Sequence, residues 1–202
     1  MANAATHGAG LALSLVGGAV LVLTAVRHGD VQQVVACSIF AATLVLLYTT
    51  STIYHALPVS DGKQRVRVAD HVAIYLLIAG SYTPFALGVL RGTLGWTLFG
   101  LTWALAAVGI LHKTLFGFRF PRLSTWMYLG MGWLAVAMIR PLSRALPSAG
   151  LAWLVAGGLC YTVGVIFYVR SHQPYRHAIW HLFVLAGSGC HYAAVLGYAT
   201  GP

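Results

Sequence analysis

The chain has 202 residues, of which 59% are hydrophobic and 7% are charged, with a mean hydropathy of +0.80. A soluble domain carries about 25% charged residues, so this composition excludes a soluble globular protein and indicates an integral membrane protein. The net charge of +9 does not indicate a nucleic-acid partner, because no basic patch is interleaved with exposed aromatic residues. Contact with anionic lipid head groups explains the charge better.

Long apolar stretches predict an all-α, polytopic membrane protein with seven transmembrane helices. At roughly 20 residues for each span, seven helices with short loops use the whole chain, so we expect one domain over residues 1–202. The first stretch is predicted to be an uncleaved helix, because no Lys or Arg precedes it and no clear cleavage site follows. The predicted helices cover about 9–26, 34–57, 69–90, 93–112, 123–140, 149–170 and 177–199.

Proline and cysteine positions refine this arrangement. Pro84 falls inside the third predicted helix, where it cannot bond to the carbonyl of Gly80, and it therefore predicts a kink. The cysteines are odd in number and lie inside apolar segments. They are expected to be buried hydrophobic residues rather than a disulfide framework.

The distribution of Lys and Arg predicts the orientation in the membrane. The side with Arg27, Arg91, Arg140 and Arg144 carries four basic residues. The side with the N-terminus and the loops after the second, fourth and sixth helices carries eight, namely Lys63, Arg65, Arg67, Lys113, Arg119, Arg122, Arg170 and Arg176. The positive-inside rule then predicts a cytoplasmic N-terminus and a C-terminus outside.

Polar residues from three helices are predicted to meet at one membrane face. His55 ends the second helix, Asp70 opens the third, and His177 and His181 lie in the first turns of the seventh. Alternating helix directions bring these three helix ends to the same side. Residues four apart share one face of a helix, so His177 and His181 point the same way. Ser51 lies one turn before His55, on its face.

This set of residues suits a zinc site. Catalytic zinc commonly takes three protein ligands and leaves a position for water, which it activates at neutral pH. We therefore predict His55, His177 and His181 as zinc ligands. Asp70 would act as general base or orient the water, and Ser51 would polarise a substrate carbonyl or fix the water.

Each residue also has a simpler interpretation. Asp70 alone could cap the third helix or pair with Arg67, and Ser51 alone could bond to the backbone one turn back. An H-x-x-x-H pair alone is a weak signal for metal. His71 points about 100° away from Asp70 on a helix and is expected to be a neighbour rather than a ligand.

The remaining histidines are expected to lie outside the zinc site. His191 would lie about 15 Å deeper than His181, too far for the same metal, although it could line a polar cavity together with Ser188. Four others are interpreted as interfacial residues at helix ends, namely His7, His28, His112 and His172.

Three segments resemble the bacterial hemolysin III branch of the progestin and adipoQ receptor family. They are S-T-I-Y-H at 51–55, A-D-H-V-A-I-Y-L-L-I-A-G-S-Y-T-P at 69–84 and H-A-I-W-H-L-F-V-L-A-G-S-G-C-H at 177–191. The resemblance extends to the alkaline ceramidases. It implies seven helices, zinc on His55, His177 and His181, and Asp70 and Ser51 beside it, in a bacterial inner (plasma) membrane.

Three functions follow as expectations, all with membrane lipids as partners. The first is a zinc-dependent intramembrane hydrolase of lipid amides or esters, involved in membrane homeostasis. The second is a non-enzymatic homeostasis or sensing protein in which zinc is structural. The third, a pore-former, finds little support because no amphipathic insertion segment is evident. A retinal protein is excluded because Lys63 and Lys113 fall outside helix interiors, and the spacing of His177 and His181 suits one metal better than haem.

Overall fold

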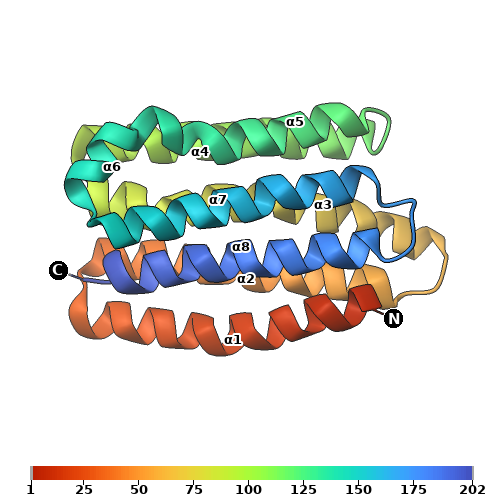
Figure 1. Cartoon of the computed structure of the whole chain (residues 1–202), viewed down its shortest axis with the longest axis horizontal. Coiled ribbons are helices and arrows are strands. Elements are labelled where there is room, and N and C mark those ends of the chain that lie inside the picture. Colours follow the sequence, from red (N-terminus) through yellow and green to blue (C-terminus); the bar gives the residue numbers. More distant parts are fainter. Residues whose placement is uncertain (1, 202) are drawn as a thin grey trace.

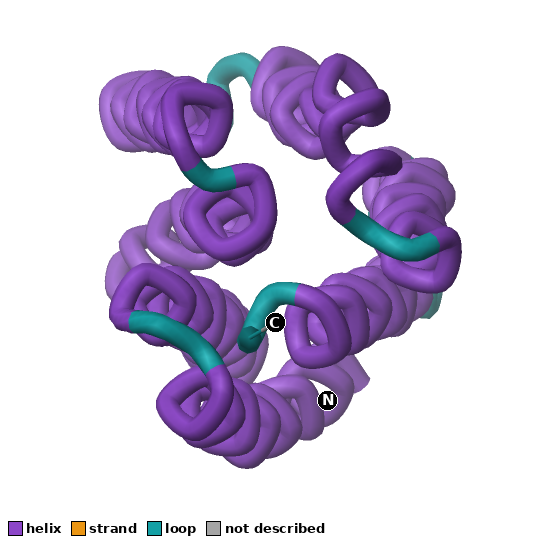
Figure 2. Tube along the Cα trace, turned by 90° about the vertical axis from the view of Figure 1, so that its left-hand side faces the viewer, coloured by secondary structure: helices purple, strands orange, loops and turns teal. Residues whose placement is uncertain are grey.

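Parallel and antiparallel helices of similar length make up the molecule. The computed structural model describes residues 2–201, and these residues form helices, turns and short loops only. The helices lie side by side along one axis (Figure 1). Viewed from the end that carries the C-terminus, they are arranged around that axis (Figure 2). They are α1 (Ala2–His28), α2 (Val31–Ala56), α3 (Asp61–Thr83), η1 (Pro84–Leu90), α4 (Gly92–Phe116), α5 (Pro121–Gly132), η2 (Trp133–Met138), α6 (Ile139–Ala145), α7 (Ser148–Val169) and α8 (Arg176–Tyr198).

The prediction of an all-α, polytopic membrane protein with seven helical spans is confirmed. Among the described residues, six helices are long and apolar enough to cross a membrane, with α3 and η1 acting as one. The seventh helical segment, which corresponds to the predicted fifth span, is the broken series α5, η2 and α6, and it is not among those six. The start of α1 and the loops 57–60, 117–120 and 170–175 share one end of the bundle (Figure 1). Which end faces the cytoplasm stays a prediction.

The break in the fifth span corrects the prediction of one continuous helix over 123–140. Pro141 has no N–H group to donate to the carbonyl one turn earlier, and the α-helix gives way to the tighter helix η2 just before it. The Tyr82 hydroxyl lies 2.7 Å from the Gly132 carbonyl oxygen and accepts from the Ala135 N–H at 2.8 Å. A side chain from α3 thus satisfies backbone groups that the break leaves free, as a membrane interior requires.

Two helices, α1 and α3, start much earlier than predicted, while the other starts differ by at most three residues. Helix α3 begins at Asp61 instead of 69, because the Ser60 side chain accepts from the Lys63 N–H and caps it. Helix α1 begins at Ala2 instead of 9, so the polar N-terminal residues join the bundle. The predicted kink at Pro84 takes the form of the π-helix η1, which continues α3.

At the end opposite the start of α1, a reciprocal cap fixes the α1–α2 turn. The Asp30 side chain accepts from the Gln33 N–H, while the Gln33 side chain accepts from the Asp30 N–H. The Asp30 carboxylate also pairs with Arg91 at 2.7 Å. The Gln33 N–H, and then Arg91, hold the pKa of Asp30 below its usual value. The ion pair between Asp30 and Arg91 joins the α1–α2 turn to the η1–α4 turn.

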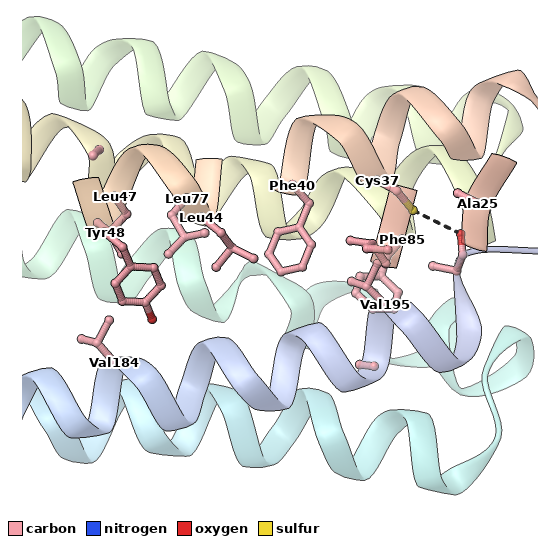
Figure 3. Packing of buried hydrophobic residues seen from close by; sticks show 14 of the residues in the cluster. Ala25, Cys37, Phe40, Leu44, Leu47, Tyr48, Leu77, Phe85, Val184 and Val195 are labelled. Atoms are coloured by element: carbon pink, nitrogen blue, oxygen red, sulfur yellow. Dashed lines mark hydrogen bonds between the residues drawn. The ribbon is translucent and has the colours of Figure 1, made fainter. Parts of the chain in front are cut away.

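The largest apolar cluster fills the space between α1, α2, η1 and α8 (Figure 3). It includes Phe40, Leu44, Phe85 and Val195, all nearly inaccessible to solvent. Cys37 lies in this cluster with its sulfur 3.9 Å from the Ala199 carbonyl oxygen. Its burial agrees with the prediction, whereas Cys160 and Cys190 are only partly buried, and all three cysteines are free thiols. The cluster gives α2 and α8 a fixed relation, on which the polar site at the other end depends.

Candidate metal centre and adjoining cavity

The three histidines predicted as ligands meet where α2 ends and α8 begins. One nitrogen from each of His55, His177 and His181 lies within 4.8 Å of the others. The Nε2 atoms of His55 and His177 are 3.2 Å apart. Two nitrogens bound to one tetrahedral zinc at about 2.0–2.1 Å lie about 3.3 Å apart. The spacing of His55 and His177 therefore fits two ligands of one metal ion, with a nitrogen of His181 within 4.8 Å of both.

The start of α1 fixes the orientation of the third histidine. Nδ1 of His181 lies 3.2 Å from the Asn3 carbonyl oxygen and 3.1 Å from Thr6 Oγ1. Protonated Nδ1 donates to that carbonyl, which leaves Nε2 free to bind a metal, the usual arrangement around metal-bound histidine. The sequence reasoning missed Asn3 and Thr6 because it began the first helix at residue 9.

The prediction that His7 is an interfacial residue is wrong. Its side chain is buried, and its ring stacks on His181 with 3.5 Å between centroids. Its Nδ1 lies 2.6 Å from the Ser51 hydroxyl, while its Nε2 is buried with no hydrogen-bond partner among the described residues. The predicted topology placed the N-terminus on the same side of the membrane as the predicted zinc site. That placement was the signal in the sequence that could have indicated a position for His7 near the site.

His112 is the other histidine whose interfacial interpretation was wrong. Both of its ring nitrogens are buried and lack a hydrogen-bond partner in the described part of the chain. Its ring packs instead against Phe116 and Phe120 at the end of α4 and in the loop that follows. His28 and His172 are exposed, in agreement with the prediction.

Asp70 and Ser51 lie beside the triad and are both buried, with exposed fractions of 8% and 1%. Asp70 does not cap its helix, because α3 begins nine residues earlier, and no ion pair with Arg67 forms within 4 Å. Ser51 contacts His7 and is also adjacent to the Asp70 carboxylate. Their simpler interpretations are therefore not the ones observed, and their part in chemistry stays a prediction.

His71 and His191 lie outside the triad. Nδ1 of His71 is 2.9 Å from the Arg67 carbonyl oxygen and 3.8 Å from Asp70 Oδ2, and the histidine group that could hold a metal does not include it. His191 stacks on Tyr161 with 5.6 Å between centroids. Ser188 is hydrogen-bonded to the Tyr161 hydroxyl at 3.0 Å.

A cavity of about 210 Å³ connects these groups. At one end lie His7, Ser51, Asp70, His177 and His181, and the lining continues past Tyr161 and His191 to Phe85, Leu142 and Leu151. His55 is not part of the lining, so the cavity meets the triad through α8. Elsewhere the walls are largely apolar and include Leu77, Ile78, Leu129, Val136, Leu154 and Val165.

The sequence of the chain also matches known proteins. The family model described as "Haemolysin-III related" matches residues 1–192. The chain belongs to the haemolysin-III family. The resemblance found in the motifs of α2, α3 and α8 is thereby confirmed. No solved structure matches the chain significantly.

Relatives of the haemolysin-III family occur in bacteria and animals. The chain is 46% identical to a hemolysin-3 homolog of Bacillus subtilis over 99% of this chain and 94% of that protein. It is 46% identical to hemolysin-3 of Bacillus cereus over 98% of this chain and 90% of that protein. It is 30% identical to the human monocyte to macrophage differentiation factor, over 98% of this chain and 83% of that protein.

The contact between Thr6 and His181 predicts a measurable effect on metal affinity. The Thr6→Val variant removes the hydroxyl but keeps the shape and leaves the Asn3 carbonyl in place. Loss of such an orienting partner weakens metal binding by about 10–100-fold, and we expect about tenfold here because one partner remains. Competition with a zinc indicator on the purified protein measures it. Thr114→Val at an exposed position of α4 is the matched control, and equal affinities in both variants would contradict the prediction.

Proposed function

We propose that this haemolysin-III protein is a zinc-dependent hydrolase that cleaves an amide or ester bond of a membrane lipid. One observation carries the proposal, namely an apolar cavity that ends on two of three clustered histidines, a buried carboxylate and a buried hydroxyl. Ionisable groups inside a membrane protein are energetically costly and by default mark a functional site. The apolar wall of the cavity is also complementary to the hydrocarbon chain of a lipid substrate.

The donor set agrees with zinc as the metal. Three imidazoles are a common ligand set for catalytic zinc, with a fourth position open to water or substrate. When bound, zinc would polarise the carbonyl and activate water at neutral pH. His55 would hold the metal from α2, while His177 and His181 would hold it from α8. The Asn3 carbonyl would keep His181 in the required tautomer.

Asp70 would handle the protons of the reaction. Water adds to the carbonyl carbon, and the carbon–nitrogen or carbon–oxygen bond breaks. A carboxylate beside the triad can take a proton from the attacking water at Oδ1 or Oδ2 and give it to the departing amine or alcohol. Ser51, held by His7 at 2.6 Å, would donate a hydrogen bond from its hydroxyl to the carbonyl oxygen as negative charge develops there.

The cavity size limits how a substrate would enter. Its volume of about 210 Å³ is below the roughly 300–1,000 Å³ typical of a pocket for a drug-sized ligand. A lipid would therefore place its reacting bond and part of one chain inside, while the rest stays in the bilayer. The broken span of α5, η2 and α6 forms part of the cavity wall, through Leu129 and Val136.

A second candidate function is membrane homeostasis or sensing with a structural metal. The observation that favours it is that the triad joins the end of α2 to the start of α8, so a metal would tie two distant parts of the chain together. This function needs the three histidines but makes no use of Asp70. The two candidates therefore differ in what a change at Asp70 does.

The test of the hydrolase proposal is lipid turnover by the purified full-length protein. Zinc-loaded protein in vesicles made from a bacterial lipid extract is expected to release fatty acid, and a chelator is expected to stop the release. Protein with one zinc per chain that releases no fatty acid from any lipid class would exclude the hydrolase proposal and favour the structural metal. Dye-loaded vesicles in the same assay would reveal a pore.

A further inference from the structure

Two positive charges share one aromatic ring at the end of the bundle that holds the triad. Lys113, in the last turn of α4, is 1% exposed, and its Nζ lies 4.6 Å from the centre of the Phe118 ring. The guanidinium carbon of Arg67, on α3, lies 3.8 Å from the same ring centre. Phe118 belongs to the α4–α5 loop. The three side chains therefore form a cationic cluster covered by a phenyl ring.

This cationic cluster lacks a carboxylate partner among residues 2–201. The chain has three aspartates and no glutamate. The carboxylates that lie within 4 Å of a basic side chain are Asp30, beside Arg91, and Asp70, beside His71. Neither reaches Lys113 or Arg67 at that distance. A buried ammonium group without a counter-charge is strongly unfavourable in a protein interior, because it has lost its hydration.

The ring alone does not compensate two charges. A cation over an aromatic face gains less free energy than burying an ammonium group costs. The two cations also repel each other, since both approach the same ring. An anion that contacts both would satisfy them better than the ring does. Arginine and lysine together are a common pair of donors for phosphate oxygens.

We propose that Lys113 and Arg67 bind a phosphate group, and that Phe118 covers this site when no anion is bound. Arg67 precedes Asp70 by three residues on α3, so the cluster lies at the depth of the candidate metal centre, near the end of the bundle. That depth is where lipid head groups meet a membrane protein. The ligand is a phosphate ester or free phosphate, and the experiment distinguishes these two sources.

The loop that carries Phe118 can release the ring. Gly117, directly before it, has a φ of +56°, in the left-handed region that glycine adopts without strain. Phe118 itself is half-buried and belongs to a loop of four residues. An anion between the two cations would displace the ring toward solvent. Removing the ring should therefore favour anion binding, whereas removing either cation should weaken it.

The site goes beyond the proposed function, because binding of phosphate there needs neither the metal nor the hydrolytic reaction. The experiment measures thermal unfolding of the full-length protein in a neutral detergent. The probes are phosphatidylglycerol, diacylglycerol with the same chains, and inorganic phosphate. A ligand that binds only the folded state raises the unfolding temperature, and the rise grows with the logarithm of ligand concentration once that concentration exceeds the Kd.

For the wild type we expect phosphatidylglycerol, but not diacylglycerol, to raise the unfolding temperature. The concentration needed for a given shift, set at the same value for every variant, should rise at least about tenfold in Lys113→Met and in Arg67→Gln, since each loses one charged partner. It should fall in Phe118→Ala. Arg119→Gln, which removes an exposed charge from the same loop, is the matched control and should behave as the wild type.

Each result decides the question. The same pattern with inorganic phosphate alone would support the site and identify free phosphate as the sufficient ligand. The pattern with phosphatidylglycerol only would identify the lipid head group. Equal shifts in all variants, or no shift in the wild type with either probe, would overturn the proposal. Lys113→Met should fold, because replacing a buried charge with an apolar chain of similar size is often neutral or stabilising, and Arg67→Gln tests the site independently.

Discussion

Purified protein loaded with zinc is expected to retain about one zinc ion per chain, and His55→Ala is expected to lose it. A site of three protein ligands that loses one keeps only the two imidazoles of α8, too few for the three-ligand set of a catalytic zinc site. His55 is also the only member of the triad on α2, so its loss removes the link between the two helices. Metal content by mass spectrometry of the detergent-purified protein measures the effect.

The control for this experiment is His172→Ala, which changes an exposed histidine in the α7–α8 loop. This variant should bind zinc as the wild type does. Zinc bound to wild type and to His55→Ala in equal amounts would locate the metal elsewhere. A well-folded wild type that binds no metal, even with zinc added, would remove the candidate metal centre and the hydrolase proposal with it.

The sequence was sufficient to predict the triad because its geometry is mostly local. His177 and His181 are one turn apart on α8, and this spacing alone places them on one face. Helices that alternate in direction then bring the end of α2 to the same side as the start of α8. The 3.2 Å between His55 and His177 required more, namely that α2 and α8 be neighbours, and hydrophobicity patterns do not specify which helices are adjacent.

The residues that sequence reasoning missed depend on such long-range contacts. Thr6 and His7 precede the first predicted helix, which begins at about residue 9, yet both contact the site. Their helix extends to Ala2 because the bundle offers these polar groups buried partners, which a reading of hydropathy cannot anticipate. The same holds for Tyr82, whose hydroxyl supports the break in the fifth span from about fifty residues away.

The second large effect is expected for Asp70→Asn, which should leave metal binding and thermal stability close to wild type while abolishing lipid hydrolysis. Asparagine has the shape of aspartate and can hydrogen-bond, but it cannot accept and return a proton at neutral pH. General acid–base groups typically contribute about 10²–10⁴-fold to the rate, and we expect a loss of that order. Fatty-acid release by zinc-loaded protein in vesicles, with metal content measured on the same sample, provides the test.

This variant separates the two candidate functions because Asp70 lies beside the triad without belonging to it. The hydrolase proposal requires its carboxylate, whereas a structural metal requires only the three imidazoles. Asp61→Asn, at the exposed start of α3, controls for the loss of one negative charge and should stay fully active. If Asp70→Asn retained both its zinc and full activity, the proton-transfer role would be wrong. If Asp70→Asn lost its zinc, the Asp70 carboxylate would be a metal ligand, and the site would have four protein ligands instead of three.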